Sequence, residues 1–212
     1  ASPGEPSVTP PAPGLGYVAT GPRAHPPAWV EPSRISGTAS VGSVERIGEA
    51  IPVAGDPDWP ALGNACHAFL AADRPGLPDD ERLEIARGAL ERWGTQGAVR
   101  PEALAAAANS LRAWSDARFP GAASHHEWPL SRRMSDGAEL AGAADVVLMN
   151  GESFVLVDHK CLAGSLAEAV RAAAGYGGQI AAYTKTIQAA TGKKSRGQYV
   201  HLVLQGAIVA LD

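Results

Sequence analysis

The chain has 212 residues, of which 45% are hydrophobic and 19% charged, as is ordinary for a globular protein with one sizeable domain or two small ones. Its net charge of −4 argues against a protein that binds duplex DNA by charge alone. The charge is compatible with an enzyme that binds a metal ion, or with a module that neighbouring domains hold to its substrate. The cysteines Cys66 and Cys161 form no CxxC pair, which argues against a zinc knuckle or a cysteine-ligated iron–sulfur cluster.

The first part of the chain is rich in proline and glycine, with segments such as Pro-Pro-Ala-Pro-Gly that form neither helices nor good strands. We predict a linker or extended arm over residues 1–58 and a folded domain over residues 59–212. Because the chain starts Ala-Ser-Pro-Gly, without an initiator Met or signal peptide, we expect a fragment tethered to a larger upstream body. No apolar run approaches ~20 residues, so we expect no membrane span.

Three helices are predicted first in the folded part. Apolar residues at helical spacing indicate a helix over residues 61–72. Acidic residues after Pro78 open a second helix, which runs to about Trp93. A third helix runs from about Pro101, a favourable first-turn residue, to Arg118.

Strands follow, predicted over residues 127–131, 140–149, 153–160 and 198–211. Asn150-Gly151-Glu152 is a hairpin turn signal between two of them. His125-His126 is predicted to lie on a loop at the surface. An Ala-rich stretch over residues 166–190 predicts a long helix, which Gly175-Tyr176-Gly177-Gly178 breaks or caps. Three consecutive helices thus precede the strands, and a further helix lies between the last two of them.

Polar residues with potential chemistry stand at the ends of the apolar strands. Asp158 and Lys160 end such a run and share one face of their strand, where both are costly to desolvate unless they serve a ligand or each other. The hairpin places Asp145 opposite residues near 157, and a small shift or bulge brings it beside Asp158. Two converging carboxylates repel unless a cation lies between them, and Mg²⁺ and Mn²⁺ prefer oxygen ligands.

Two helices contribute further polar candidates. His67 lies mid-helix among small and apolar neighbours, which predicts an imidazole against a packed surface; a neutral imidazole can ligate Mn²⁺. Gln179 and Tyr183 are four residues apart on one helix face, where they can bond a phosphate or position the strand ends. Each candidate also has a plain structural interpretation: a strand-end salt bridge, a satisfied core histidine and an ordinary amphipathic pair.

Taken in order, these motifs match a known family. GAADVV (residues 142–147), VDHK (157–160) and QIAAY (179–183), preceded by a helical GNACHAFL, resemble the RecB-family branch of the PD-(D/E)XK nucleases. Over about residues 60–212 the chain most resembles the C-terminal nuclease domain of an AddA-type helicase–nuclease. The resemblance implies an α/β fold with a restriction-endonuclease-like core, in which helices flank a mixed central sheet. It also implies a metal-dependent exodeoxyribonuclease acting in recombinational double-strand break repair. Such an enzyme would depend on ATP only through the missing helicase part.

The resemblance also implies residue roles. Asp145 and Asp158 would bind Mg²⁺ or Mn²⁺, with His67 and the carbonyl of His159 completing the shell. Lys160 would be catalytic together with the two acids, and Gln179 and Tyr183 would support the site. His159 stands where the family more often has Tyr. Glu127, in Glu-Trp-Pro-Leu, matches the acid-x-Pro strand of the family and stays open between a site residue and an edge-strand charge.

The same resemblance implies partners and a location: DNA, with a single-stranded end as the favoured form; upstream helicase domains of the same chain; and a second, AddB-like subunit. The expected location is the bacterial cytoplasm, associated with the nucleoid, with no membrane contact. Two alternatives remain open. One is a non-catalytic nuclease-like module that binds DNA or a partner, and the other is a standalone endonuclease of restriction type.

Overall fold

The computed structural model describes residues 29–212. Its helices are α1 (Trp59–Ala72), α2 (Asp79–Arg92), α3 (Pro101–Arg118), α4 (Leu166–Ala173) and α5 (Gly177–Thr191), with short 3₁₀ turns η1 (Pro32–Arg34) and η2 (Ala174–Tyr176). Its strands are β1 (Trp29–Val30), β2 (Val41–Arg46), β3 (Ala123–Arg133), β4 (Glu139–Asn150), β5 (Ser153–Lys160), β6 (Lys194–Leu202) and β7 (Ala207–Leu211).

These strands form one seven-stranded mixed sheet, as predicted. The long antiparallel β3–β4 hairpin runs along one side, and β4 then pairs antiparallel with β5 through the predicted turn at Gly151. β5 and β6 are parallel, and β7 and β2 complete the sheet by antiparallel pairing. β5 is buried along almost its whole length, which explains its apolar sequence.

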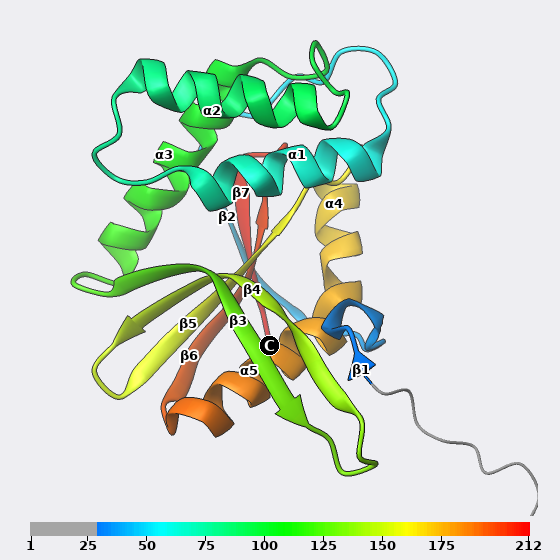
Figure 1. Ribbon diagram of the computed structural model, residues 1–212, viewed down its shortest axis with the longest axis vertical. Coiled ribbons are helices and arrows are strands. Elements are labelled where there is room, and N and C mark those ends of the chain that lie inside the picture. Colours follow the sequence, from blue (N-terminus) through cyan, green and yellow to red (C-terminus); the bar gives the residue numbers. More distant parts are fainter. Residues whose placement is uncertain (1–28) are drawn as a thin grey trace, which may run out of the picture.

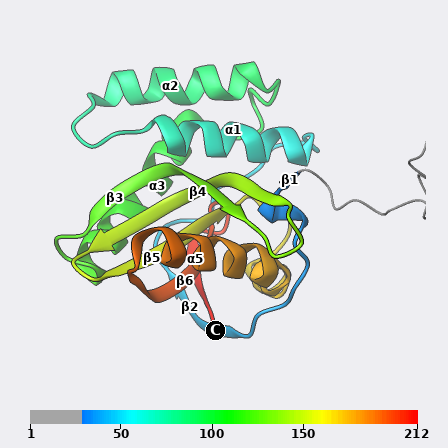
Figure 2. The same ribbon diagram turned by 60° about the horizontal axis from the view of Figure 1, so that its bottom comes forward.

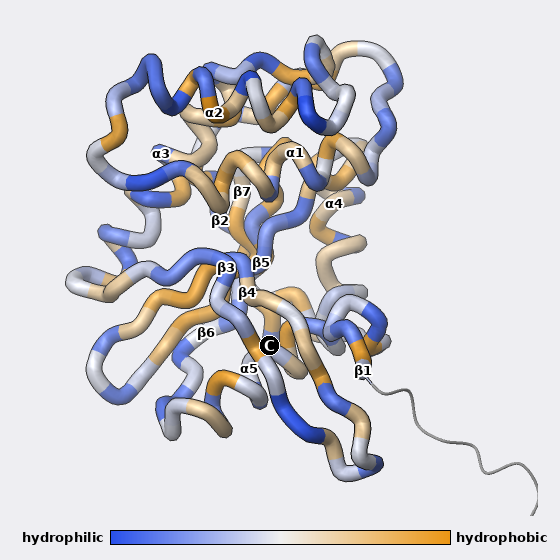
Figure 3. The backbone as a smooth tube through the Cα atoms, in the orientation of Figure 1, coloured by the Kyte–Doolittle hydropathy of each residue, from blue (hydrophilic) through white to orange (hydrophobic). Residues whose placement is uncertain are grey.

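Helices cover both faces of the sheet, so the fold has three layers (Figures 1 and 2). The three helices α1 to α3 lie on one face, where Leu111 and Trp114 of α3 pack against the strands. On the other face, Ile180 and Ile187 of α5 pack against the apolar side chains of β5 and β6. α2 is the outermost helix and alternates between hydrophilic and hydrophobic residues (Figure 3). Within residues 29–212, no helix combines the length and apolar character needed to cross a bilayer.

The structure differs from the predicted linker over residues 29–58. β2 pairs with β7 at the edge of the sheet, and Ile51 is buried in the core beneath α1 to α3. The Val and Ile residues scattered through this segment supply that pairing and burial, although its Pro and Gly content suggested an arm. The rest of the predicted linker, residues 1–28, lies outside the described residues.

The predicted break in the Ala-rich helix is present at η2, and the glycines that follow it leave room for the N-terminal segment. A Cβ on Gly178 would lie 2.4 Å from the carbonyl oxygen of Ile35, because the segment after η1 crosses the start of α5 at this point. The Gly178 amide donates to the carbonyl of Gly37 at 3.1 Å. Only glycine permits so close an approach of two backbones. This contact fastens the N-terminal segment to the face of the sheet covered by α5.

Two sequence predictions about strands are wrong. The predicted final strand is a hairpin, β6 and β7, whose turn contains buried Val203 and Leu204 and ends at Gly206 with φ +59°. Because this turn is apolar and buried, its residues look like strand continuation. His125-His126 lies within β3 rather than on a loop, since β3 starts at Ala123 and pairs with β4 over its length.

Candidate active site

The sheet forks at the two predicted acids. β4 and β5 pair from Asn150–Ser153 to Val146–Val157, and this register continued places Asp145 opposite Asp158 without the predicted shift or bulge. β5 then continues beside β6, while β4 continues beside β3. At the fork, Asp145 Oδ2 accepts a hydrogen bond of 2.6 Å from the backbone N–H of His159. The Asp145 side chain thus accepts a hydrogen bond from the His159 amide at the point where β4 and β5 separate, so this amide is not left unpaired.

Asp158 is held from two sides in a buried position. Its Oδ2 lies 2.6 Å from Nζ of Lys160, which confirms that the two side chains project together. Its Oδ1 accepts a hydrogen bond of 3.1 Å from Nε2 of Gln179, and the same amide donates to the hydroxyl of Tyr183 at 3.3 Å. Lys160 Nζ also lies 4.5 Å from the ring centroid of Tyr176, within cation–π distance.

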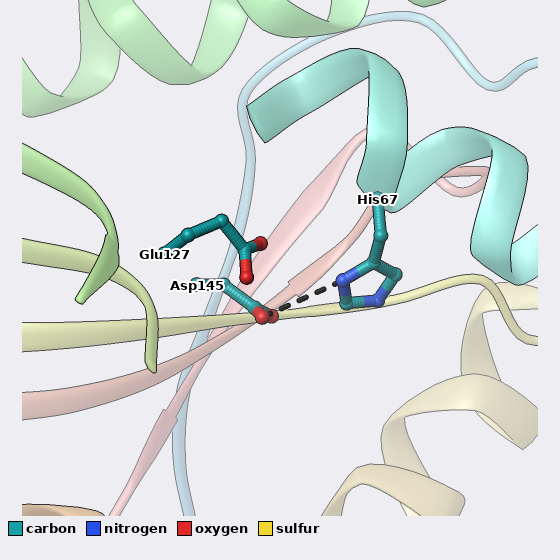
Figure 4. A group of neighbouring side chains, drawn as sticks. All are labelled: His67, Glu127 and Asp145. Carbon is teal, nitrogen blue, oxygen red and sulfur yellow. Dashed lines mark ion pairs between the residues drawn. The ribbon is translucent and has the colours of Figure 1, made fainter. Parts of the chain in front are cut away.

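A second group, formed by His67, Glu127 and Asp145, lies beside this pair. Their potential ligand atoms all lie within 4.8 Å of one another, and His67 Nδ1 is 3.5 Å from Asp145 Oδ1. Figure 4 shows the three side chains converging from α1, β3 and β4. The His67 side chain is 31% exposed, so it faces this open cluster rather than the packed surface that its neighbours predicted.

Glu127 has an unusual backbone. Its φ of 49° is the only positive value at a non-glycine residue within residues 29–212. A residue in this region is held by its surroundings at a cost of about 1–3 kcal/mol. At Glu127 the backbone of β3 leaves the extended conformation. The side chains of β3 therefore stop alternating regularly between the two faces of the sheet at this point, next to Asp145. Such strain is frequent at functional sites, which supports a place for Glu127 in the site.

Burial and charge set the electrostatics of the acids. Burial and the charge of Asp145 raise the pKa of Asp158 to about 6, although Lys160 opposes the rise. Burial alone would raise the pKa of Asp145, but the neighbouring His67 and the His159 amide outweigh it and lower this pKa. Burial disfavours a charged Lys160, but the charge of Asp158 outweighs it and raises the lysine pKa. The carboxylates of Asp145 and Asp158 therefore repel each other, and the neighbouring Lys160 and His67 offset part of this repulsion.

The donor set of the cluster fits a hard divalent cation. Two carboxylates and one imidazole converge, and oxygen-rich sets of this kind suit Mg²⁺ and Mn²⁺. Partial burial and the charge of Asp145 raise the pKa of Glu127. None of the ion pairs within residues 29–212 involves Glu127. Glu127 is therefore a third carboxylate near Asp145 and Asp158, and it has no cationic partner in this part of the chain. A bound cation would stabilise this arrangement.

The structure brings together every residue that the sequence singled out for the site. These are His67, Asp145, Asp158, His159, Lys160, Gln179 and Tyr183. The side chain of His159 lies between two other histidines, with its ring centroid 5.8 Å from that of His67 and its Nδ1 3.2 Å from Nδ1 of His201. Sequence reasoning missed His201 and Tyr176, which carry no motif signal. The parallel β5–β6 pairing, had it been predicted, would have placed His201 beside His159.

His201 predicts a pH dependence of stability. Burial, followed by the charge of His67, lowers its folded-state pKa to about 4, against about 6.5 in the unfolded chain. Its contribution is therefore complete above pH 6.5 and is lost as pH falls toward 4, because only the unfolded chain takes up the proton. In EDTA, going from pH 7.5 to 5.0, the wild type should lose about 2 kcal/mol more unfolding free energy than His201→Asn. Urea denaturation at the two pH values measures this, and equal losses would contradict it.

The comparisons with known proteins agree with this geometry. A search of curated proteins found no significant match. A family model described as the PD-(D/E)XK nuclease superfamily matches residues 41–210, a range that includes β2 and every site residue named above. This match covers most of the chain, and the protein therefore belongs to the PD-(D/E)XK nuclease superfamily.

Proposed function

We propose that this domain hydrolyses phosphodiester bonds of DNA with the help of a divalent metal ion. Members of the superfamily are typically metal-dependent nucleases. The observation that carries the proposal is the sheet fork, where Asp145 and Asp158 lie next to the last paired residues of β4 and β5 and Lys160 lies 2.6 Å from Asp158. A purely structural salt bridge would require neither the second acid nor the neighbouring His67 and Glu127.

His67, Asp145 and Glu127 would hold Mg²⁺ or Mn²⁺, and Asp158 and the carbonyl of His159 would be further ligands. A divalent cation there would lower the pKa of a bound water and neutralise charge on the phosphate. Lys160 stays protonated beside Asp158 and presents its ammonium group to the negative charge that develops during cleavage. Gln179 and Tyr183 act as positioning residues, because the Gln179 amide donates to the Asp158 carboxylate and the Tyr183 hydroxyl accepts from the same amide.

We further propose that the domain is the nuclease part of a helicase–nuclease subunit of AddA type. It would degrade DNA as an exonuclease during repair of double-strand breaks in bacteria, with helicase domains upstream and an AddB-like subunit beside it. The order of motifs from His67 to Tyr183 and the Pro-rich sequence of residues 1–58 support this proposal. Full-length protein tested with and without ATP on linear and circular duplexes would distinguish an exonuclease coupled to a helicase from a standalone endonuclease.

Glu127 gives a direct test of the ligand set. Glu127→Gln keeps the shape of the side chain but removes its charge, and should weaken Mn²⁺ binding about tenfold, since ligand charge tunes affinity at oxygen sites. Glu139→Gln, at the far end of the β3–β4 hairpin, is the matched control and should bind like the wild type. Isothermal titration with Mn²⁺ measures both variants. Unchanged affinity in Glu127→Gln would remove Glu127 from the ligand set.

The same titration tests the proposed function. The wild-type chain should bind Mg²⁺ or Mn²⁺, and Asp145→Asn should lose most of that binding. DNA affinity without any divalent-ion binding would instead favour a non-catalytic module that binds DNA.

A further inference from the structure

A cavity of about 670 Å³ lies next to the candidate active site and takes no part in the proposed chemistry. Residues near the C-terminal end of α1, the second half of α3 and the strands β3 and β4 line it. Its volume falls within the range of about 300–1,000 Å³ typical of pockets that enclose small molecules. The cavity is therefore large enough to enclose part of a substrate.

The cavity continues from the acid cluster along two walls. On α1, His67 faces Asp145, and Leu70, three residues further along the same helix, lines the cavity together with Arg74, which follows the end of the helix. On β3, Glu127 belongs to the acid cluster, and the preceding His126 lines the cavity. His159 belongs to both, because its amide bonds to Asp145 while the residue also lines the cavity.

The lining matches the chemistry of an unpaired nucleobase. The floor is apolar, formed by Leu111, Val146 and Leu148, and the aromatic rings of Phe119 and Trp128 border it. The rim carries hydrogen-bonding groups, among them Arg74, Arg112, Ser115 and Asp116. A nucleobase has an apolar face that packs on such a floor and polar edges that bond to such a rim.

We propose that this cavity holds one unpaired base of a single DNA strand whose neighbouring phosphate lies at the acid cluster. The inference rests on the proposed function and adds a binding pocket for one base of the substrate. A base in a duplex is stacked and paired, and would have to be flipped out at a cost of a few kcal/mol before it could enter. The site is therefore selective for single-stranded DNA or frayed ends, which suits a chain with a net charge of −4.

Binding of single-stranded oligodeoxynucleotides in EDTA tests the proposal without cleavage. Each oligonucleotide carries one 2-aminopurine, placed at successive positions, and a second series carries an abasic residue at the same positions. At one position, 2-aminopurine fluorescence should change on binding, and removal of that base should raise Kd about 5- to 150-fold. Other positions should respond little.

Ser115→Trp fills the cavity from the half-buried surface of α3, and Ala117→Trp, exposed on the same helix and outside the cavity, is the matched control. Ser115→Trp should lose the position-specific signal, while Ala117→Trp keeps it; equal melting temperatures verify that both are folded. A signal that is absent in the wild type, or that persists in Ser115→Trp, would overturn the inference. Metal-dependent cleavage without the signal would refute the base pocket alone, whereas the signal without cleavage would refute the proposed nuclease.

Discussion

Lys160→Ala is expected to lower the rate of metal-dependent DNA cleavage by about 10²–10³-fold, the usual effect of removing one group that stabilises transition-state charge. Among residues 29–212, the ammonium group of Lys160 is the only cation that forms an ion pair with Asp158, at 2.6 Å from Oδ2. Its position over the Tyr176 ring and beside a buried carboxylate keeps it charged. Single-turnover cleavage of labelled DNA at saturating Mn²⁺ measures the loss.

Two further variants separate chemistry from folding. Lys185→Ala removes an exposed lysine of α5 and should leave the rate unchanged. Because Lys160→Ala leaves Asp158 buried without its cation, some loss of stability is expected in EDTA. The pair Asp158→Asn/Lys160→Met removes both charges together and should stay folded, yet be inactive. Full cleavage by folded Lys160→Ala would exclude a catalytic role for this lysine.

Asp73→Ala is expected to destabilise the protein by about 3–5 kcal/mol, because it leaves the buried guanidinium group of Arg82 without its buried carboxylate partner. Asp73 follows the end of α1 and is 2% exposed. Its oxygens accept hydrogen bonds from Nε and Nη2 of Arg82, at 2.7 and 3.0 Å, and from Nη2 of Arg112 at 2.9 Å. This carboxylate therefore joins α1 to α2 and α3, the helices that place His67 above the fork.

A surface ion pair of the same protein provides the control. Glu84 and Arg87 pair on the exposed side of α2, so Glu84→Ala should change the unfolding free energy by at most about 1 kcal/mol. Replacing both buried partners, as Asp73→Leu/Arg82→Met, should recover much of the loss, because neither charge is then left alone. Urea denaturation measures all three. A loss below about 1 kcal/mol for Asp73→Ala would contradict a structural role for this network.

The local signals of the sequence were sufficient for much of the fold. Apolar spacing for α1 and the Pro at the start of α3 predicted these helices closely, and Asn150-Gly151-Glu152 predicted the β4–β5 hairpin. What local signals could not supply was pairing between distant segments. β2 joins the sheet only through β7, far along the chain, so its short run looked like part of a linker. The buried turn at Val203 and Leu204 escaped prediction because its apolar residues continue the strand pattern.

The candidate site also contains some residues that local sequence signals predicted and others that only the structure shows. Asp145, Asp158 and Lys160 follow from hairpin register and strand alternation, since a two-residue turn fixes which residues face one another. Glu127 stayed undecided, because the positive φ that interrupts the alternation of β3 has no signal in the sequence Glu-Trp-Pro-Leu. Tyr176 lies under Lys160 only because η2 separates α4 from α5 at that point. Such contacts depend on tertiary packing and require the structure.

The most direct test of the central claim is a cleavage assay with end-labelled single-stranded DNA. Wild type and Asp158→Asn would be incubated side by side with Mn²⁺, Mg²⁺ or EDTA. Metal-dependent hydrolysis at the sheet fork predicts shortened products only from the wild type and only with a divalent ion. Equal cleavage by Asp158→Asn, equal cleavage in EDTA, or intact DNA in every reaction with a folded, metal-bound wild type would contradict it.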